Sequence, residues 1–560
     1  MFKGHPKGLI VAFFANMGER FGFYTMVAIF VLFLQAKYGM TSAESSRVYG
    51  IFMGFVYFFP LLGGIIADKA LGYGKTIGIG LVVMFAGYFM LAFPTPMTTG
   101  FPLIVAALGT IALGTGLFKG NLQALVGKMY ESPEFAPNRD RAFTLFYMGI
   151  NIGAMFAPTA AEKINNWILS KGNFFYDGRI PALANHYLKG TLEDAAKYLG
   201  IAQAQDPSIT IETLGAFSEK YINMLSKSYH YGFGVACFSL IISMLVFWGF
   251  RKHYKHADYM VTDKTRAQGI PSHVQTLTRA QIKDRFIALG LVYVVVIFFW
   301  MSFHQSGVCM TYFARDYTQP TVGKATNLWF DLFGLLPIFL AVLGAWFALK
   351  PGGASRTRGL GFAAFVVFAV LAFVRYRGYD AVNPFTPQKF QHFNPFFIVA
   401  LTPLVVGFFS WLNGRGKEPT APRKIGYGML MTAGAFGLLL LGSIGLASPK
   451  ELVGQVAPES MLVSPYWLIW TYFILTVAEL FLSPMGISFV AKVAPPQYKG
   501  LCQGGWFAAT AIGNYLLGVI GWFWDRVPLW TLWLILVGCC LVSAAFIFSV
   551  MKRLERATTS

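Results

Sequence analysis

Residues 8–36 read GLIVAFFANMGERFGFYTMVAIFVLFLQA, and this stretch decides the fold class. It is apolar throughout except for a central polar group that includes Glu19 and Arg20. A helix needs about 20 predominantly apolar residues to cross the core of a bilayer, so this stretch is long enough to span one. It is too long for a cleavable signal peptide, and no small-residue cleavage site follows it, so we expect the helix to be retained.

The composition of the whole chain agrees with a membrane protein. Of the 560 residues, 56% are hydrophobic and only 12% are charged, whereas charged residues make up about 25% of a soluble protein. A soluble enzyme is thereby excluded, and the 55 Phe and 13 Trp exclude a disordered chain. The five cysteines show no C-x-x-C and no metal-ligand spacing, so we expect no metal site. Long apolar runs without strand alternation favour helices over a β-barrel.

The apolar pattern predicts fourteen transmembrane helices, of which the eighth to tenth are interrupted by prolines. They lie near residues 8–36, 47–67, 75–94, 101–127, 142–168, 229–250, 285–314, 325–349, 359–376, 396–412, 425–446, 466–491, 501–523 and 528–551. Two six-helix bundles plus two extra helices is an arrangement typical of a major-facilitator transporter. We therefore expect an all-α polytopic membrane protein with that fold.

The predicted domains follow from the spans and from the polar segments between them. They are a first six-helix bundle at 1–252, a polar cytoplasmic linker at 253–283, a second bundle at 284–551 with an extra helix pair at about 325–376, and a cytoplasmic tail at 552–560. Within the first bundle, residues 169–228 form a long outer loop with helical periodicity. A solvated cap of short surface helices is favoured for this loop over a substrate vestibule.

The basic residues indicate the orientation of the chain in the membrane. One alternate set of short loops, together with both tails, carries most of the Lys and Arg, so both termini are expected to be cytoplasmic. Arg375, Arg377 and Lys389 are exceptions on the opposite side. The net charge of +20 is thus explained by topology, and no nucleic-acid partner is expected. No N-x-S/T sequon is present, which favours a bacterial inner membrane.

The first helix carries several polar residues at membrane depth, where ionisable groups are expensive and usually functional. Asn16, Arg20 and Tyr24 are spaced by four and share one helix face. Glu19 is offset from that face but lies within reach of a neighbouring helix. The alternative interpretation is that Glu19 and Arg20 form a self-compensating pair that holds helices together.

Three further ionisable residues lie within predicted spans. Lys119 in the fourth span and Glu479 in the twelfth lie in opposite halves, so a pair that forms and breaks between them is a candidate gate, and a static buried salt bridge is the alternative. His304 in the seventh span is either a titratable site or a hydrogen-bonded core residue. Asp68, between the second and third spans, lies in a segment whose spacing resembles the major-facilitator loop motif.

At this point the sequence resembles the proton-dependent oligopeptide transporter (POT) family, and the likeness covers most of the chain. Each of five stretches is a weak signal alone, but together they are specific. They are ERFGFYTM at 19–26, similar to E-x-x-E-R-F; GTGLFKGN at 114–121, similar to G-T-G-x-x-K-P-N; FYMGINIG at 146–153, similar to F-Y-x-x-I-N-x-G; Asn394-Pro395 with Phe397, Pro403 and Trp411; and the segment from Glu479 through Pro484 and Gly486 to Trp506 and Tyr515.

The resemblance implies that the protein imports di- or tripeptides by alternating access, with protons as the coupling ion and no cofactor. The positions that match the family's peptide site are Tyr24, Tyr57, Lys119, Asn151, Trp300, Asn394 and Glu479. A zwitterionic peptide needs a cation for its carboxylate and an anion for its amino group, which Lys119 and Glu479 supply. Proton coupling and gating are expected from Glu19, Arg20, Lys119, His304 and Glu479.

The chain also departs from the family pattern. The first Glu of E-x-x-E-R is Asn16, the family's Arg three residues after Tyr24 is Val27, and the acid of its seventh-helix F-E-Q is His304. In the family, that Arg and that acid are thought to pair across the halves on the outer side. Because both are replaced here, the outer gate is expected to close by packing, with His304 as a candidate for bonding across. The extra helix pair also lies after the seventh span, where it could be a lipid-facing buttress or a dimer contact.

Two other functions remain as alternatives. The altered motif residues are compatible with a facilitator, or with a symporter of a different small solute on the same fold. A polytopic sensor or membrane enzyme is disfavoured because the chain contains no H-E-x-x-H, G-x-S-x-G or phosphate-binding glycine motif. The expected partners are a small-molecule substrate and the lipid bilayer. The sequence is compatible with a monomer and leaves the oligomeric state open.

Overall fold

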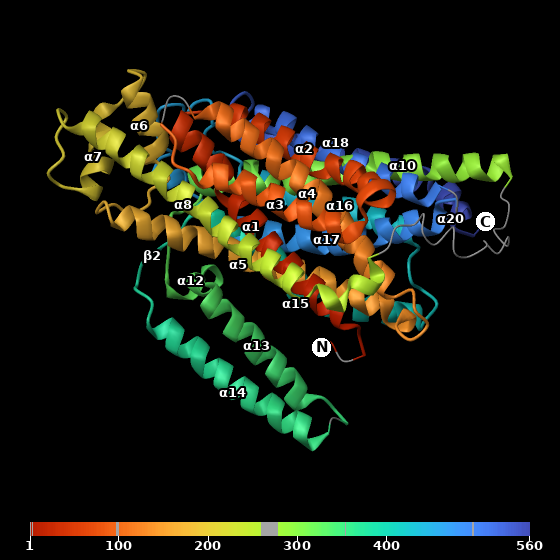
Figure 1. Ribbon diagram of the computed structural model, residues 1–560. Helices are drawn as coiled ribbons and strands as arrows, with labels where there is room; N and C mark the ends of the chain where they lie inside the picture. Colours follow the sequence, from red (N-terminus) through yellow and green to blue (C-terminus); the bar gives the residue numbers. More distant parts are fainter. Residues whose placement is uncertain are drawn as a thin grey trace.

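Long helices run side by side and form an elongated bundle (Figure 1). The computed structural model describes all residues except 1, 3, 97–99, 259–277, 353, 496–497 and 560. Two short helices, α6 and α7, lie at one end of the bundle, called here the cap end (Figure 1). Both termini lie toward the opposite end, called the terminal end. The fold is helical except for one short antiparallel pair among the described residues, β1 (Thr321–Val322) with β2 (Asn383–Pro384).

The first half of the chain contains six long helices and the two short ones. They are α1 (Lys7–Tyr38), α2 (Ser42–Ile66), α3 (Tyr73–Ala92), α4 (Phe101–Met129), α5 (Arg139–Ser170), α6 (Ile180–Leu188), α7 (Ala195–Gln205) and α8 (Leu214–Gly249). Local signals set several boundaries. Thr41 and Glu44 form a reciprocal capping box at the start of α2, and Gly39 ends α1 with a φ of 57°.

The second half contains the remaining helices. They are α10 (Arg279–Phe303), α11 (Cys309–Asp316), α12 (Lys324–Phe330), α13 (Leu332–Leu349), α14 (Ser355–Arg377), α15 (Phe393–Asn413), α16 (Ala421–Gly442), α17 (Tyr466–Val493), α18 (Lys499–Trp522), α19 (Leu529–Ser549) and α20 (Met551–Thr559). A short 3-10 turn, His304–Gly307, connects α10 to α11, and another, Pro387–His392, precedes α15.

The halves meet chiefly where α2 packs along α18 and where α5 packs against α15. Glycines allow the first of these contacts. A Cβ on Gly50 of α2 would lie 2.9 Å from the Cα of Gly518 on α18, closer than real Cβ atoms approach. The two helices therefore touch backbone to backbone at this point.

Thirteen helices among the described residues are long and apolar enough to cross a membrane, which agrees with a polytopic protein. The helix α18 is not one of them, although the sequence predicts a span at 501–523. Its glycines and polar residues such as Asn514 lower its mean hydropathy. The other predicted spans correspond to long helices in the structure.

Several helix boundaries in the structure differ from the predicted ones. The outer loop predicted at 169–228 is shorter, because α5 continues to Ser170 and residues 214–228 are the first turns of α8. The helical pattern near 183–199 is split into α6 and α7. The eighth span, expected at 325–349, is broken at Asp331, where α12 ends and α13 begins. The tail at 552–560 lies largely in a helix, α20, and most of the predicted linker, 253–283, lies outside the described residues.

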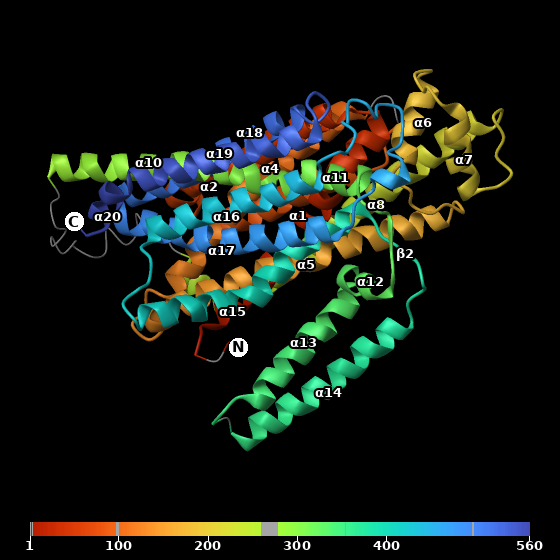
Figure 2. The ribbon, with the colours of Figure 1, turned by 180° about the vertical axis from the view of Figure 1, so that it is seen from behind.

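The extra helix pair, α13 and α14, forms a hairpin that diverges from the other helices in both views (Figures 1 and 2). At the end of the hairpin nearest the bundle, Asp331 before α13 accepts hydrogen bonds from Arg375 Nε at 2.5 Å and from the Tyr379 hydroxyl at 2.8 Å. These bonds connect the start of α13 to the end of α14. Only 6% of the residues in the most apolar 18-residue stretch of α14 are buried. A helix that is apolar on all sides and unburied is suited to contact with lipid rather than water.

Candidate functional site

The polar residues expected in the membrane are buried midway along three long helices. Glu19 and Arg20 on α1 are 0% and 3% exposed, and Glu479 on α17 is 7% exposed. Lys119 lies midway along α4 and is half-buried. The candidate site is thus an internal polar region formed by both halves of the chain.

Glu19 and Arg20 neutralise each other. Arg20 donates from Nε to Glu19 Oε2 at 2.5 Å and from Nη2 to Oε1 at 2.6 Å. The guanidinium also lies 4.6 Å from the centre of the Phe23 ring. This two-point geometry satisfies both charges within one helix, as the self-compensating interpretation of the pair predicts.

Lys119 has a different environment. Its Nζ lies 3.8 Å from the centre of the Tyr57 ring, a cation–π contact with α2. Among the described residues it forms no ion pair within 4 Å, so the predicted pair with Glu479 is not formed in this structure. A half-buried ammonium group without a counter-ion is able to accept the carboxylate of a ligand.

Glu479 is held by hydrogen-bond donors from both halves. The Tyr147 hydroxyl on α5 donates to Oε1 at 3.1 Å, and Asn394 Nδ2 on α15 donates to Oε2 at 3.0 Å. Asn394 also donates to Thr476 Oγ1 at 3.1 Å. The bond from Tyr147 therefore connects the first half to the second at the carboxylate itself.

Tyr147 was not among the predicted site residues, although it lies in the quoted FYMGINIG stretch. The sequence feature that could have indicated Tyr147 is its spacing of four from Asn151, because this spacing places both residues on one face of α5. Asn151, a predicted substrate residue, donates from Nδ2 to the Tyr147 carbonyl one turn earlier at 3.0 Å. Its amide nitrogen is thus engaged within its own helix.

Three aromatic rings meet beside Lys119. The His304 ring is stacked on Trp300 with centroids 4.9 Å apart, and its centroid lies 5.9 Å from that of Tyr57. Trp300 Nε1 and His304 Nδ1 are buried and have no hydrogen-bond partner among the described residues. His304 contacts the first half through this ring packing, and within the described part of the chain it forms no hydrogen bond across the halves. Tyr24 packs edge-on against Phe23 at 5.5 Å, one turn from Arg20.

The cap end carries the polar contacts that close the halves together. Lys389, just before α15, forms an ion pair with Glu162 of α5 at 3.0 Å, and both side chains are nearly buried. Arg315 on α11 donates to Gln35 on α1, and the Tyr312 hydroxyl lies 2.8 Å from Ser45 Oγ on α2. Polar contacts therefore join the two halves at the cap end in addition to packing.

Asp525, between α18 and α19, adds a contact between the halves at the same end. It accepts a hydrogen bond from the Ala43 backbone N–H at 3.1 Å, in the first turn of α2. Burial raises the pKa of the Asp525 carboxyl, and the bond from Ala43 partly offsets this effect.

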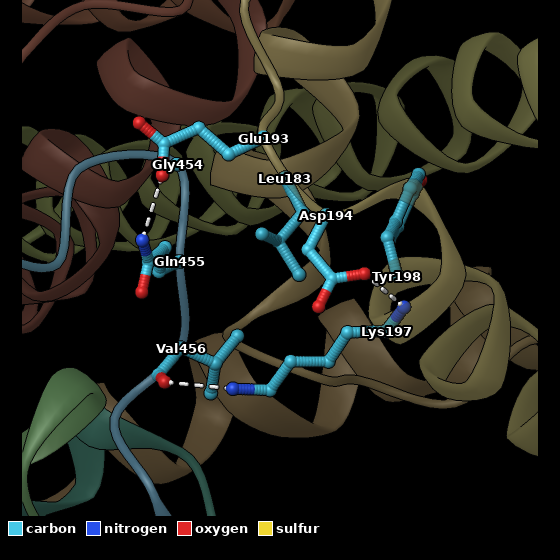
Figure 3. A pocket seen from close by; sticks show the side chains of 8 residues that line it. All are labelled: Leu183, Glu193, Asp194, Lys197, Tyr198, Gly454, Gln455 and Val456. Carbon is cyan, nitrogen blue, oxygen red and sulfur yellow. Dashed lines mark hydrogen bonds between the residues drawn. The ribbon is translucent and has the colours of Figure 1, made fainter.

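A small cavity of about 150 Å³ lies outside the central site, between α7 and the segment before α17 (Figure 3). Its polar groups are already paired with one another. Lys197 Nζ donates to the Val456 carbonyl at 3.1 Å, and Gln455 Nε2 donates to Glu193 Oε2 at 2.8 Å. The cavity therefore marks a contact between the cap and the second half rather than a free binding site.

A membrane transporter is the class of protein that this fold and site define: two helical halves, polar contacts between them, and buried charges at their interface. The chain belongs to the POT family, a branch of the major-facilitator superfamily, because the model of that family matches residues 74–266 and 365–558, more than half of the chain. It is a transporter and not an enzyme.

Curated relatives are similar along nearly their whole length. Dipeptide and tripeptide permease B of Xenorhabdus bovienii is 27% identical over 517 residues, which cover 91% of this chain and 86% of the relative. The uncharacterized transporter YclF of Bacillus subtilis is 26% identical, with 94% of this chain and 90% of the relative covered.

Solved structures show the same fold. A crystal structure of a peptide transporter POT in complex with sulfate has a TM-score of 0.66 and 23% identity, and covers 100% of this chain and 96% of that one. A POT family transporter in complex with 5-aminolevulinic acid has a TM-score of 0.67 and 17% identity, and covers 99% and 98%. The predicted major-facilitator fold is thus confirmed.

Proposed function

We propose that the protein imports di- and tripeptides by alternating access, coupled to protons. The observation that carries this proposal is the placement of two opposite charges in opposite halves of one polar region. Lys119 has no ion pair among the described residues, and Glu479 is bonded from both halves. A zwitterionic peptide would bind its carboxylate to the first and its amino group to the second. The relative named dipeptide and tripeptide permease B supports the same substrate class.

The proposed topology has fourteen spans with both termini in the cytoplasm of a bacterial inner membrane. The helix α18 supplies the fourteenth span, supported by its length and its packing along α2. Residues 1–252 and 284–551 would form the two moving units, joined by the linker at 253–283, with the tail at 552–560 inside. The cap end would then face outward, so the contacts there would form the outer gate.

The proposed peptide site comprises Tyr24, Tyr57, Lys119, Asn151, Trp300, Asn394 and Glu479, and the proposed coupling and gating set comprises Glu19, Arg20, Lys119, His304 and Glu479. Aromatic rings would accommodate variable side chains, while Lys119 and Glu479 would bind the peptide termini. Because little of the side chain is recognised, many peptides would be accepted.

Proton coupling would act on the bond between Tyr147 and Glu479. An ionised carboxylate is the stronger acceptor, so protonation of Glu479 would weaken the bond that joins the halves. The halves could then separate at the terminal end and release the peptide. Coupling requires that proton and peptide bind the outward and inward states with different affinities.

The ion pair between Glu162 and Lys389 provides a test of the outer gate. We expect Lys389→Glu to place two like charges together and to lower dialanine uptake by about tenfold, because the outward-closed state loses a nearly buried pair. The double variant with Glu162→Lys and Lys389→Glu should recover most of the rate. Uptake that is equally low in the double variant would contradict a gating role for the pair.

The substrate class is tested by competition. Uptake of labelled dialanine into proteoliposomes should be inhibited by unlabelled di- and tripeptides and not by the corresponding free amino acids. Inhibition by amino acids alone, or no dialanine uptake, would contradict the peptide assignment.

The second candidate is a facilitator or a symporter of another small solute that carries both an amine and a carboxylate. The replacements Asn16, Val27 and His304 favour it, because they alter the expected coupling residues. The family structure bound to 5-aminolevulinic acid shows that such a ligand fits this fold. Inhibition of uptake by 5-aminolevulinic acid but not by dipeptides would support this candidate.

A further inference from the structure

The two short helices α6 and α7, called here the cap, are fastened to the first half of the chain. On α6, Asn185 Nδ2 donates to the Ala36 carbonyl near the end of α1 at 3.2 Å. On α7, the Tyr198 hydroxyl lies 2.7 Å from Ser218 Oγ on α8, and both side chains are buried. The cap and the first half therefore form one packed unit.

The segment between α16 and α17, residues 443–465, is fastened to the second half. Near its start, the Tyr317 hydroxyl, directly after α11, donates to the Ala447 carbonyl at 2.9 Å. Near its end, the Val463 N–H donates to the Tyr317 carbonyl at 2.8 Å, and the Val463 carbonyl accepts from the Gln319 N–H at 3.0 Å. Both ends of the segment are therefore held by the second half.

The middle of this segment, residues 448–459, is called here the bridge loop, and it lies against the cap (Figure 3). Gln455 Nε2 donates to Glu193 Oε2 at 2.8 Å, and Lys197 Nζ donates to the Val456 carbonyl at 3.1 Å. The side chains of Glu193, Lys197 and Gln455 are exposed. Water competes for such exposed polar contacts, so they are broken and remade at small cost.

Alternating access makes this contact depend on the state of the transporter. In transporters built from two bundles, access alternates largely by rocking of one bundle against the other. When the halves part at the cap end, the cap moves with the first half and the bridge loop with the second. The separation of Glu193 from Gln455 must then increase. In this structure the halves are joined at the cap end, also by the ion pair between Lys389 and Glu162.

We propose that α7 and the bridge loop form a latch of the outer gate, closed in this structure and opened each time the halves part at the cap end. This inference rests on the alternating access of the proposed function and goes beyond it, because it assigns a gating role to the cap and to the bridge loop. Since the latch bonds are exposed, the latch favours the closed arrangement without preventing opening.

The latch is tested by joining its two sides. Glu193→Cys and Gln455→Cys would be combined in a Cys539→Ser background, because the other native cysteines are buried. A bifunctional methanethiosulfonate reagent would link the two thiols, and dithiothreitol would release them. Initial dialanine uptake should fall at least about tenfold on linking and recover on release, because a transporter held closed at the cap end cannot load substrate. Undiminished uptake after complete linking, or failure of the pair to link, overturns the latch.

A matched control joins two sites within the first half. Gln205 Oε1 at the end of α7 accepts from the Phe175 N–H at 3.0 Å, so Phe175→Cys with Gln205→Cys spans the cap without crossing to the second half. Linking this pair should leave uptake unchanged. An equal loss of uptake in both pairs would assign the effect to a stiffened cap and contradict the latch.

Spin labels on the same cysteines report the latch without a substrate. Double electron–electron resonance in liposomes should show two distances between positions 193 and 455, a shorter and a longer one, in an acidic or an alkaline buffer. The pair at 175 and 205 should show one. A single short distance between 193 and 455 in both buffers overturns the latch. Absence of dialanine uptake by the parent protein overturns the peptide function instead and leaves this measurement valid.

Discussion

Replacing Lys119 with alanine is expected to abolish driven dialanine uptake, with the initial rate falling at least about 100-fold. The peptide carboxylate would lose its cation in a region with no other unpaired positive side chain among the described residues. Removing one partner of a buried ion pair costs about 3–5 kcal/mol, and each 1.4 kcal/mol is a factor of ten. The measurement is initial uptake into proteoliposomes that contain equal amounts of each protein.

Two variants control this experiment. Lys128→Ala removes a lysine from the end of the same helix, where Nζ lies over the Tyr73 ring at 4.3 Å, and should retain most of the activity. Lys119→Arg keeps the charge and should retain part of the uptake. Undiminished uptake by Lys119→Ala would contradict both the binding role of Lys119 and its gating role.

Replacing Glu479 with glutamine is expected to separate transport from coupling. The amide keeps an oxygen that can accept from Tyr147 but cannot gain or lose a proton, so the bond between the halves no longer responds to protonation. Accumulation driven by a proton gradient should fall to the equilibrium level, while exchange of labelled for unlabelled dialanine across the membrane continues.

The control for this variant is Glu451→Gln, in an exposed segment at the cap end, which should accumulate dialanine as the parent protein does. Tyr147→Phe removes the bond from the first half and should also weaken coupling, since the carboxylate then contacts only its own half. Gradient-driven accumulation by Glu479→Gln would show that another group carries the proton.

Much of the fold was predictable because hydropathy and length determine membrane spans directly. Hydropathy does not identify α18 as a span in the same way. Its glycines allow close contact with α2, and they also lower the mean hydropathy of the helix. The start of α8 at Leu214 was missed because its first turns are amphipathic and cover the cap rather than face lipid. At the break, Asp331 caps α13 by accepting from the Phe333 N–H, and its further bond with Arg375, 44 positions away, could not be found from the sequence.

Two of the three loop cations that departed from the expected pattern form ion pairs in the structure. Lys389 is paired with Glu162 of the other half, and Arg375 is paired with Asp331 at the base of the hairpin. A paired cation contributes little net charge to its loop. Such pairs could not be found from the sequence because each joins segments that become neighbours only after folding.

The roles of the predicted site residues remain predictions, and their contacts could not be predicted from the sequence. The motif stretches indicated Lys119 and Glu479, which the structure places inside the bundle without an ion pair between them. Tyr147 and Glu479 are separated by 332 positions, so only the packing of α5 against the second half brings them together. The unpartnered nitrogens of Trp300 and His304 likewise became apparent only from the arrangement of the rings.

The most direct test of proton-coupled peptide import is dialanine uptake into proteoliposomes with and without an inward proton gradient, at one external pH. We predict accumulation above equilibrium with the gradient and equilibration alone without it. Equal, non-concentrative uptake in both conditions would contradict coupling and indicate a facilitator, and no uptake in either would contradict the peptide substrate.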